Sequence, residues 1–179
     1  AERQKTALLY RNAGVAQLLN AVNATLFSYV HATLDSPAAV AVLWWCLLIG
    51  IVSGRYLLAR RFHAVRPDAG QAAAWRRRYI AVTALLACAW GLGSILFMWH
   101  ASDAAFLFTG LVLTGMVAGA VPILSPVPAA YRAFVLPVLL PMSAVILLQA
   151  DTPMHWAFGG LAMIFLIALL VGARNLHET

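Results

Sequence analysis

The sequence predicts an all-α polytopic membrane protein with six transmembrane helices and both termini in the cytoplasm. Hydrophobic residues make up 63% of its 179 positions and charged residues only 10%, whereas a soluble domain carries about 25% charged residues. The apolar residues form six runs, and the basic residues lie in alternate segments between them. Because such a small number of charged residues cannot cover a water-facing surface, most of the surface must face lipid.

The six apolar runs give the expected organisation of the chain. Crossing about 30 Å of hydrocarbon takes roughly 20 helical residues, and a helix is required because lipid offers no partner to free backbone groups. Residues 1–14 are expected to form a cytoplasmic amphipathic lead-in. Residues 174–179 are expected to begin a cytoplasmic signalling helix at which the chain is truncated. The predicted spans, within residues 15–173, are residues 15–30, 38–58, 79–99, 104–124, 129–148 and 156–173.

The basic residues predict the orientation. All 12 fall on the side of the termini, whereas the three opposite turns carry Asp35, Asp103 and Asp151. By the positive-inside rule, the termini face the cytoplasm of a bacterial inner membrane. Arg55, one turn inside its run, is expected to snorkel to the inner interface. Nucleic-acid binding is not indicated, because the basic residues form no stripe with exposed aromatics.

Three amide side chains follow one another at three-residue intervals in the first run. Gln17, Asn20 and Asn23 therefore lie roughly along one helix face, and that face should look inward, because a buried amide needs a partner. Interhelical hydrogen bonding is the simpler interpretation. The functional alternative is a polar site for the head group of a ligand.

Small residues and prolines suggest how the helices pack. Gly50 with Gly54, and Gly115 with Gly119, have the small-xxx-small spacing that allows close helix approach, within the bundle or at a dimer interface. Two further residues, Pro137 and Pro141, fall inside the fifth run. Each removes a helical hydrogen bond, so a kink is expected there. The kink is either static or the boundary of a ligand pocket and hinge.

The three outer turns each carry a histidine: His31, His100 and His155. If these turns converge, the imidazoles could hold copper or another metal ion, with Met98 and Met154 as thioether partners. The order Met154-His155-Trp156 resembles the Met-His-Tyr-Thr motif of a copper-associated membrane sensor family, although Trp156 and Ala157 replace its Tyr and Thr. The simpler interpretation is polar capping of helix ends, and a third is proton sensing. No cofactor is firmly indicated.

Catalytic motifs are absent from the sequence. It contains no H-E-x-x-H zinc motif, no G-x-S-x-G elbow and no phosphate-binding Walker loop. No Asp, Glu or Lys lies in the core of a run, which disfavours an ion-coupled pump. The chain is therefore not expected to be an enzyme in itself.

Several stretches resemble a family of membrane domains. They are "LLYRNAGVAQLLNAVNATLFSYV", "WRRRYIAVTALLACAWGLGSILF", "GLVLTGMVAGAVPILSPVPAAYRAFVLPVLLP" and the final "FLIALLVGARNLHET". Together they resemble the six-helix N-terminal sensor domains that precede GGDEF, EAL or histidine kinase domains in bacterial signalling proteins. The resemblance implies a homodimer that controls cyclic-di-GMP turnover or a kinase.

The predicted function is a transmembrane input domain. With only short outer turns, the signal must be read in the membrane or at its outer face, as a lipid-like molecule, a small ion or protons. Binding among the first, fourth and fifth spans would shift the last one. A small-solute transporter or channel is the first alternative, and a structural subunit of a membrane complex is the second.

Overall fold

The computed structural model describes residues 2–11, 13–34, 36–68 and 70–178, with their side chains except those of residues 2–5, 154, 170 and 172–178. Within these ranges the chain forms seven helices and no strand. All the elements found there are α-helices, which confirms the all-α prediction, and a helix covers each apolar run. The helices are α1 (Glu2–Arg11), α2 (Ala13–Thr33), α3 (Ala38–Val65), α4 (Ala72–Met98), α5 (Asp103–Leu124), α6 (Pro128–Leu148) and α7 (Pro153–Glu178).

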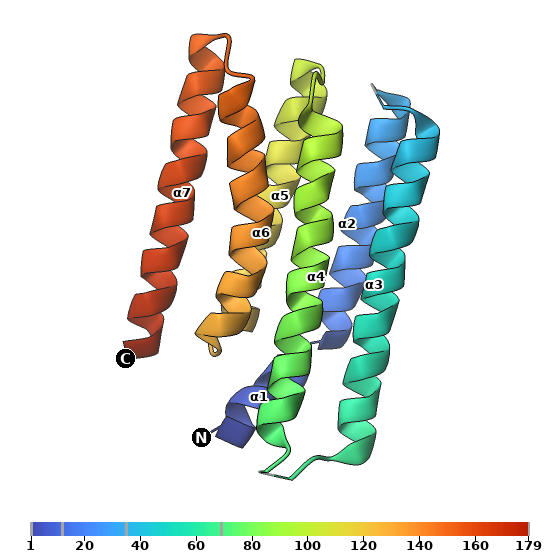
Figure 1. Ribbon diagram of the computed structural model, residues 1–179, viewed down its shortest axis with the longest axis vertical. Coiled ribbons are helices and arrows are strands. Elements are labelled where there is room, and N and C mark those ends of the chain that lie inside the picture. The colour runs from blue at the N-terminus through green and yellow to red at the C-terminus, as the bar shows by residue number, and fades with distance from the viewer. Residues whose placement is uncertain (1, 12, 35, 69, 179) are drawn as a thin grey trace.

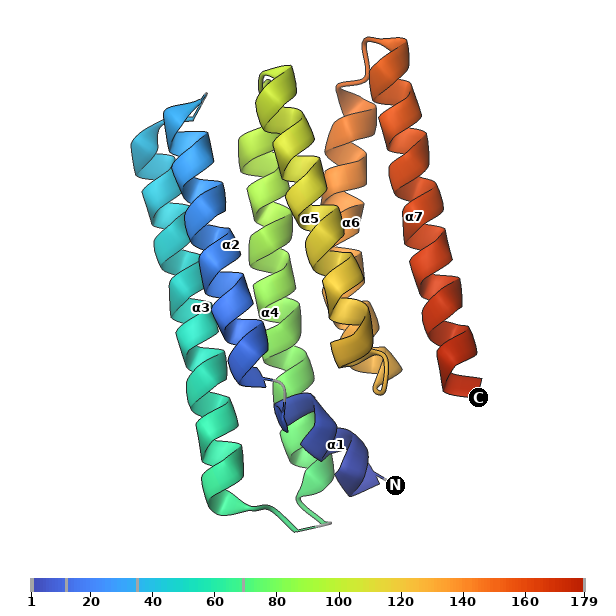
Figure 2. The ribbon, with the colours of Figure 1, turned by 180° about the vertical axis from the view of Figure 1, so that it is seen from behind.

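The six longer helices run side by side in alternating directions (Figure 1). The paired helices α2 and α3 form one edge of the bundle, α7 forms the other, and α4, α5 and α6 lie between them in both views (Figure 2). The short helix α1 and the C-terminal end of α7 lie at the same end of the bundle. We call this end, which also holds the α3–α4 and α5–α6 turns, the terminal end.

Four helices, α3 to α6, are long and apolar enough to cross a membrane. Helix α2 has a similar length but is not among these four, and it carries Gln17, Asn20 and Asn23. Large hydrophobic side chains cover the outside of the bundle: Leu43 and Leu111 are 70% and 72% exposed. Such an extended apolar exterior is typical of a surface that faces lipid.

Helix α1 is held at the terminal end by aromatic side chains. Tyr10 is buried, stacks on Phe62 of α3 at 3.9 Å between ring centroids, and meets Tyr79 of α4 edge-on at 5.0 Å. Its hydroxyl donates a hydrogen bond of 3.0 Å to the backbone carbonyl of Trp75. Burial raises the pKa of the Tyr10 hydroxyl, so this donor stays protonated. Helix α1 therefore clamps the ends of α3 and α4 together.

Helix α4 packs most closely against α6, at a glycine. A Cβ atom on Gly91 would collide with the backbone carbonyl oxygen of Pro137. Because residue 141 is also a proline, that carbonyl lacks the N–H that would normally bond to it four residues on. On the other side of α4, a Cβ on Gly93 would lie 2.8 Å from the Trp44 ring of α3. These two glycines let α4 lie between its neighbours at the centre of the bundle.

The glycine pairs that the sequence singled out do not pack inside the chain. A Cβ atom added to Gly50, Gly54, Gly115 or Gly119 would meet nothing within 4 Å. The prediction that these pairs bring helices together within the bundle is therefore wrong. Close approach occurs instead at Gly91, Gly93 and Gly159, where backbone or bulky side chains fill the space. The dimer alternative stays a prediction.

We expect Gly91→Ala to destabilise the protein, because the new methyl group collides with backbone that cannot rotate away. Overpacking of this kind costs about 1–3 kcal/mol. Gly50→Ala is the matched control, because its methyl group meets nothing within 4 Å. Replacing a helical glycine by alanine should raise the free energy of unfolding by roughly 0.5–1 kcal/mol. Thermal unfolding in detergent, followed by circular dichroism, measures both. Equal melting temperatures for the two variants would contradict the close approach of α4 and α6.

Candidate ligand cavity between α2 and α5

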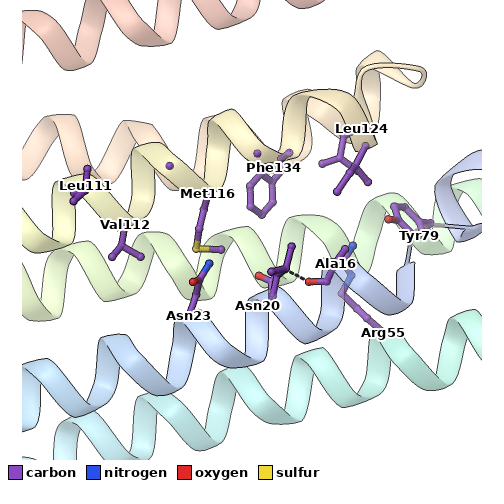
Figure 3. Close-up of a pocket in the computed structure, with 15 residues that line it drawn as sticks. Ala16, Asn20, Asn23, Arg55, Tyr79, Leu111, Val112, Met116, Leu124 and Phe134 are labelled. Atoms are coloured by element: carbon purple, nitrogen blue, oxygen red, sulfur yellow. Dashed lines mark hydrogen bonds between the residues drawn. The ribbon is translucent and has the colours of Figure 1, made fainter.

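A cavity of about 370 Å³ lies between α2 and α5. This volume falls within the range of roughly 300–1,000 Å³ that is typical of small-molecule sites. Helix α5 supplies most of an apolar wall, α2 supplies Asn20 and Asn23, α3 supplies Arg55, α4 supplies Tyr79 and α6 supplies Phe134 (Figure 3). Five helices therefore meet around one space, although most of its lining comes from two of them.

Arg55 forms the polar end of the cavity. Its side chain is 6% exposed, its Nη2 donates to the Thr83 hydroxyl at 3.2 Å, and its guanidinium carbon lies 5.3 Å from the centre of the Tyr79 ring. Its Nε atom is buried without a hydrogen-bond partner. The prediction that Arg55 snorkels to the membrane interface is therefore wrong. The side chain turns into the bundle, toward Tyr79 (Figure 3).

No carboxylate neutralises this arginine in the described part of the chain. The salt bridge found there joins His155 to Asp151, at the end of the bundle opposite the terminal end. The chain has only six acidic residues, and none lies in α2 or α3 or in the stretch of α5 that lines the cavity. The neutral groups around Arg55 leave the cavity with a net positive charge.

The amide side chains of α2 divide between the cavity and the core. Asn20 lines the cavity, donates from Nδ2 to the Ala16 carbonyl at 2.8 Å and accepts from the Trp90 indole at 3.2 Å. Asn23 also lines it, opposite Met116 (Figure 3). Gln17 is buried, and neither of its amide atoms has a hydrogen-bond partner. Two of the three predicted residues therefore reach the cavity, and Gln17 does not line it.

The cavity opens through the flank of the bundle. Leu19 of α2 and Leu111 of α5 line it and are 53% and 72% exposed. Gly115 and Gly119 also line it, and their missing side chains leave a slot along α5. Leu19 and Leu111 both lie within helices rather than in a turn. A molecule embedded beside the helices could therefore enter without crossing an aqueous turn.

The two interior prolines do not line the cavity. Helix α6 is continuous through both, and they face Gly91 of α4. The contribution of α6 to the cavity wall is Phe134. The prediction that Pro137 and Pro141 contact a ligand is therefore not borne out by the cavity lining, whereas their role as a hinge stays a prediction.

His31 lies inside the bundle rather than on an outer turn. It is fully buried, and its ring lies 4.5 Å and 4.7 Å from the rings of Phe27 and Phe97. Its Nε2 lies 2.8 Å from the Thr109 hydroxyl. That hydroxyl donates its one hydrogen to the Ala105 carbonyl at 2.8 Å. With the Thr109 hydrogen on Ala105, the histidine donates to Thr109 from Nε2, and the pair links α2 to α5.

The other two outer histidines have separate surroundings. His155 Nδ1 lies 2.7 Å from Asp151 Oδ1, and its ring packs against Phe106. His100 is exposed in a left-handed conformation (φ 56°), and its backbone N–H donates to the Gln149 side chain at 2.7 Å.

The predicted metal site does not form among these groups. No cluster of three or more His, Cys, Asp or Glu residues that could hold a metal occurs in the part of the chain that the structure describes. Met98 is buried, and the predicted role of Met154 falls on a side chain outside the described residues. The burial of His31 among aromatic rings is what separates it from the other two histidines.

The sequence-based reasoning missed Arg55 and Tyr79 as site residues. Arg55 nevertheless carries a signal in the sequence, because it is the one basic residue that falls within the run 38–58. An ionisable residue at membrane depth is a functional candidate by default. Nothing in the sequence marks Tyr79, whose place next to Arg55 follows from the packing of α3 against α4.

Comparisons with family models, with curated proteins and with solved structures find no match to this chain. The function must therefore be inferred from the cavity and the bundle themselves.

We expect Thr109→Val to destabilise the bundle by about 1–3 kcal/mol, because it leaves the buried His31 Nε2–H without this acceptor. Thr114→Val is the control on the same helix, since the Thr114 hydroxyl bonds to carbonyls of its own helix. Its effect should stay within about 0.5 kcal/mol. Unfolding of both variants in detergent measures the difference, and equal losses would contradict a special role for the His31–Thr109 bond.

Proposed function

We propose that the chain is a membrane sensory domain. It takes up a small amphipathic signal in the cavity between α2 and α5 and passes a conformational change through α7 to a cytoplasmic output. The observation that carries this proposal is the cavity itself: it has the size of a small-molecule site and opens sideways between helices, with a buried cation at one end. The resemblance to six-helix bacterial input domains suggests the output, either cyclic-di-GMP turnover or a histidine kinase, in a homodimer.

The charge distribution supports an inner-membrane location with cytoplasmic termini. The terminal end of the bundle carries α1, the α3–α4 turn and the α5–α6 turn. Exposed arginines lie in these turns or in the helix ends next to them, among them Arg60, Arg66, Arg77 and Arg132, and the opposite turns contain no Lys or Arg. In this proposal all six longer helices cross the membrane, and the polar side chains of α2 are tolerated because they face the bundle.

The contacts of α6 provide a route from the cavity to α7. Phe134 of α6 forms part of the cavity wall. Further along, Leu147 of α6 packs against α7 at Gly159, where a Cβ would lie 2.5 Å from the leucine side chain. A ligand that displaces Phe134 would therefore move α6, and α7 with it. Pro137 and Pro141 lie between these two contacts and weaken the helix that joins them.

The proposed topology predicts the behaviour of reporter fusions. Alkaline phosphatase, which is active only outside the cytoplasm, should be active when inserted in the α2–α3, α4–α5 or α6–α7 turn. It should be inactive in the α3–α4 and α5–α6 turns, because the basic residues keep these turns in the cytoplasm. Green fluorescent protein should show the reverse pattern. Activity of the phosphatase in the α3–α4 turn would contradict the orientation.

Filling the cavity should mimic a bound signal. In a chain joined through α7 to a histidine kinase core, we expect Gly115→Leu to change kinase activity by about 5-fold or more, the lower part of the usual range for coupled sites. Gly50→Leu is the matched control, because it adds the same side chain to an open helix face outside the cavity. Phosphorylation of the purified fusion in vesicles measures both.

Three outcomes would count against parts of this proposal. If Gly115→Leu and Gly50→Leu have the same kinase activity as the parent chain, the cavity does not control the output. If replacing Pro137 and Pro141 by alanine leaves the effect of Gly115→Leu unchanged, the hinge is wrong. Flux of a small solute through vesicles that contain the chain, blocked by Gly115→Leu, would favour the transporter alternative.

A further inference from the structure

We infer that the molecule bound in this cavity is an amphipathic anion, with an apolar tail and a single carboxylate or phosphate group that pairs with Arg55. This inference rests on the proposed function, because it names the chemical class of the signal that the same cavity would take up. It is carried by the unneutralised guanidinium, the buried groups next to it and the shape of the apolar slot.

The buried positive charge of Arg55 favours an anionic ligand. A guanidinium keeps its proton in proteins, and a buried charge is costly unless it is paired. Here its neighbours are the Thr83 hydroxyl and Tyr79, and both of these groups are neutral. A neutral ligand would leave the charge unpaired, whereas an anionic head group would neutralise it.

The polar end of the cavity also has the geometry to hold such a group. A carboxylate or phosphate can accept two parallel hydrogen bonds from one guanidinium, and the guanidinium of Arg55, which lines the cavity, has five N–H donors and uses only some of them on Thr83 and Tyr79. Tyr79 lines the same end of the cavity and lies next to Arg55 (Figure 3).

The remaining cavity suits an apolar tail. Its α5 wall consists of Leu111, Val112, Met116, Ile123 and Leu124, interrupted by Gly115 and Gly119. The lining runs from Leu124, at the polar end, to Leu111 at the other end (Figure 3), and Leu111 is 72% exposed. A tail longer than the cavity can therefore leave through the flank and remain among the lipid chains. A water-soluble anion would gain nothing from this wall.

The position of Arg55 along α3 indicates which leaflet supplies the ligand. It lies ten residues before the end of α3 at Val65, or about 15 Å at 1.5 Å per residue, on the side of the terminal end. The head group would therefore sit toward the leaflet that faces the termini, with the tail directed to the bilayer centre. Both a free fatty acid and an anionic phospholipid of that leaflet have this arrangement.

The test uses the full chain in phosphatidylcholine nanodiscs, titrated with oleate labelled with ¹³C at its carboxylate, and with oleyl alcohol as the uncharged probe. Calorimetry gives the affinity, and the carboxylate resonance reports pairing of the head group. We expect Arg55→Gln to weaken oleate binding by about tenfold or more. Arg60→Gln should leave it unchanged, because Arg60 is exposed on the same helix. Oleyl alcohol should bind weakly, and equally to the parent chain and to Arg55→Gln.

A second variant covers the case in which Arg55→Gln does not fold. Gly115→Leu blocks the slot but leaves Arg55 in place, and its Cβ meets nothing within 4 Å, so it should also abolish oleate binding. Unchanged oleate binding by Gly115→Leu would overturn the assignment. So would oleyl alcohol binding as tightly as oleate, or an equal loss of affinity in Arg60→Gln and Arg55→Gln.

Two further experiments identify the source of the anion and distinguish a failure of the ligand assignment from a failure of the proposed sensory function. If phosphatidylglycerol in the nanodiscs competes with oleate, and Arg55→Gln removes the competition, the natural occupant is a bilayer phospholipid; lack of competition favours a free fatty acid. Both results support the shared chemistry. If oleate binds through Arg55 but does not change the kinase activity of the fusion, the proposed sensory function is wrong and the ligand assignment is still supported. If oleate changes the kinase activity of the fusion equally in the parent chain and in Arg55→Gln, the ligand assignment is wrong but the sensory function is not.

Discussion

Polar groups inside an apolar surrounding must find their partners within the chain, and this constraint shapes the whole bundle. It requires helices, since they satisfy their own backbone, and it then decides which helices are joined by side chains. The Trp44 indole donates to the Ala89 carbonyl at 2.9 Å and links α3 to α4. The His31–Thr109 pair links α2 to α5, and the Trp90–Asn20 pair links α4 to α2. The constraint is met only in part at several buried groups, among them Gln17 and Arg55, and beside Arg55 the bundle contains a cavity.

The cavity and the helix α1 share one residue. Tyr79 lies under the Arg55 guanidinium on one side and against the Tyr10 ring on the other. The Tyr10 ring in turn stacks on Phe62, and its hydroxyl holds the Trp75 backbone. The polar end of the cavity is therefore in direct contact with the aromatic cluster that closes the terminal end. Any group that rearranges Arg55 acts on Tyr79, and through it on the packing of α1.

The positions of the helices could be predicted from the sequence, but their rotations about their own axes could not. Apolar runs and polar turns are local signals, so each predicted span coincides with a helix. In a chain that is apolar on nearly every face, however, hydrophobicity no longer distinguishes the buried side of a helix from the lipid-facing side. His31 and Arg55 consequently turned out to face inward, and Gly50 and Gly54 outward. Only Asn20 and Asn23, as amides on one face, carried a rotational signal strong enough to point to the cavity.

The packing of α7 against mainly one neighbour, α6, has a consequence for local stability. Its described buried side chains are those of Ala162 and Leu166, next to the bare backbone of Gly159, whereas α4 is buried on several sides. Helices in lipid are held mainly by packing contacts and interhelical hydrogen bonds, and α7 packs mainly against one neighbour, α6, whereas α4 contacts helices on several sides. The bundle thus has a graded stability, in which α7 can open as a unit while the core around α4 stays folded. An excursion of α7 alone would leave the network of buried polar pairs intact.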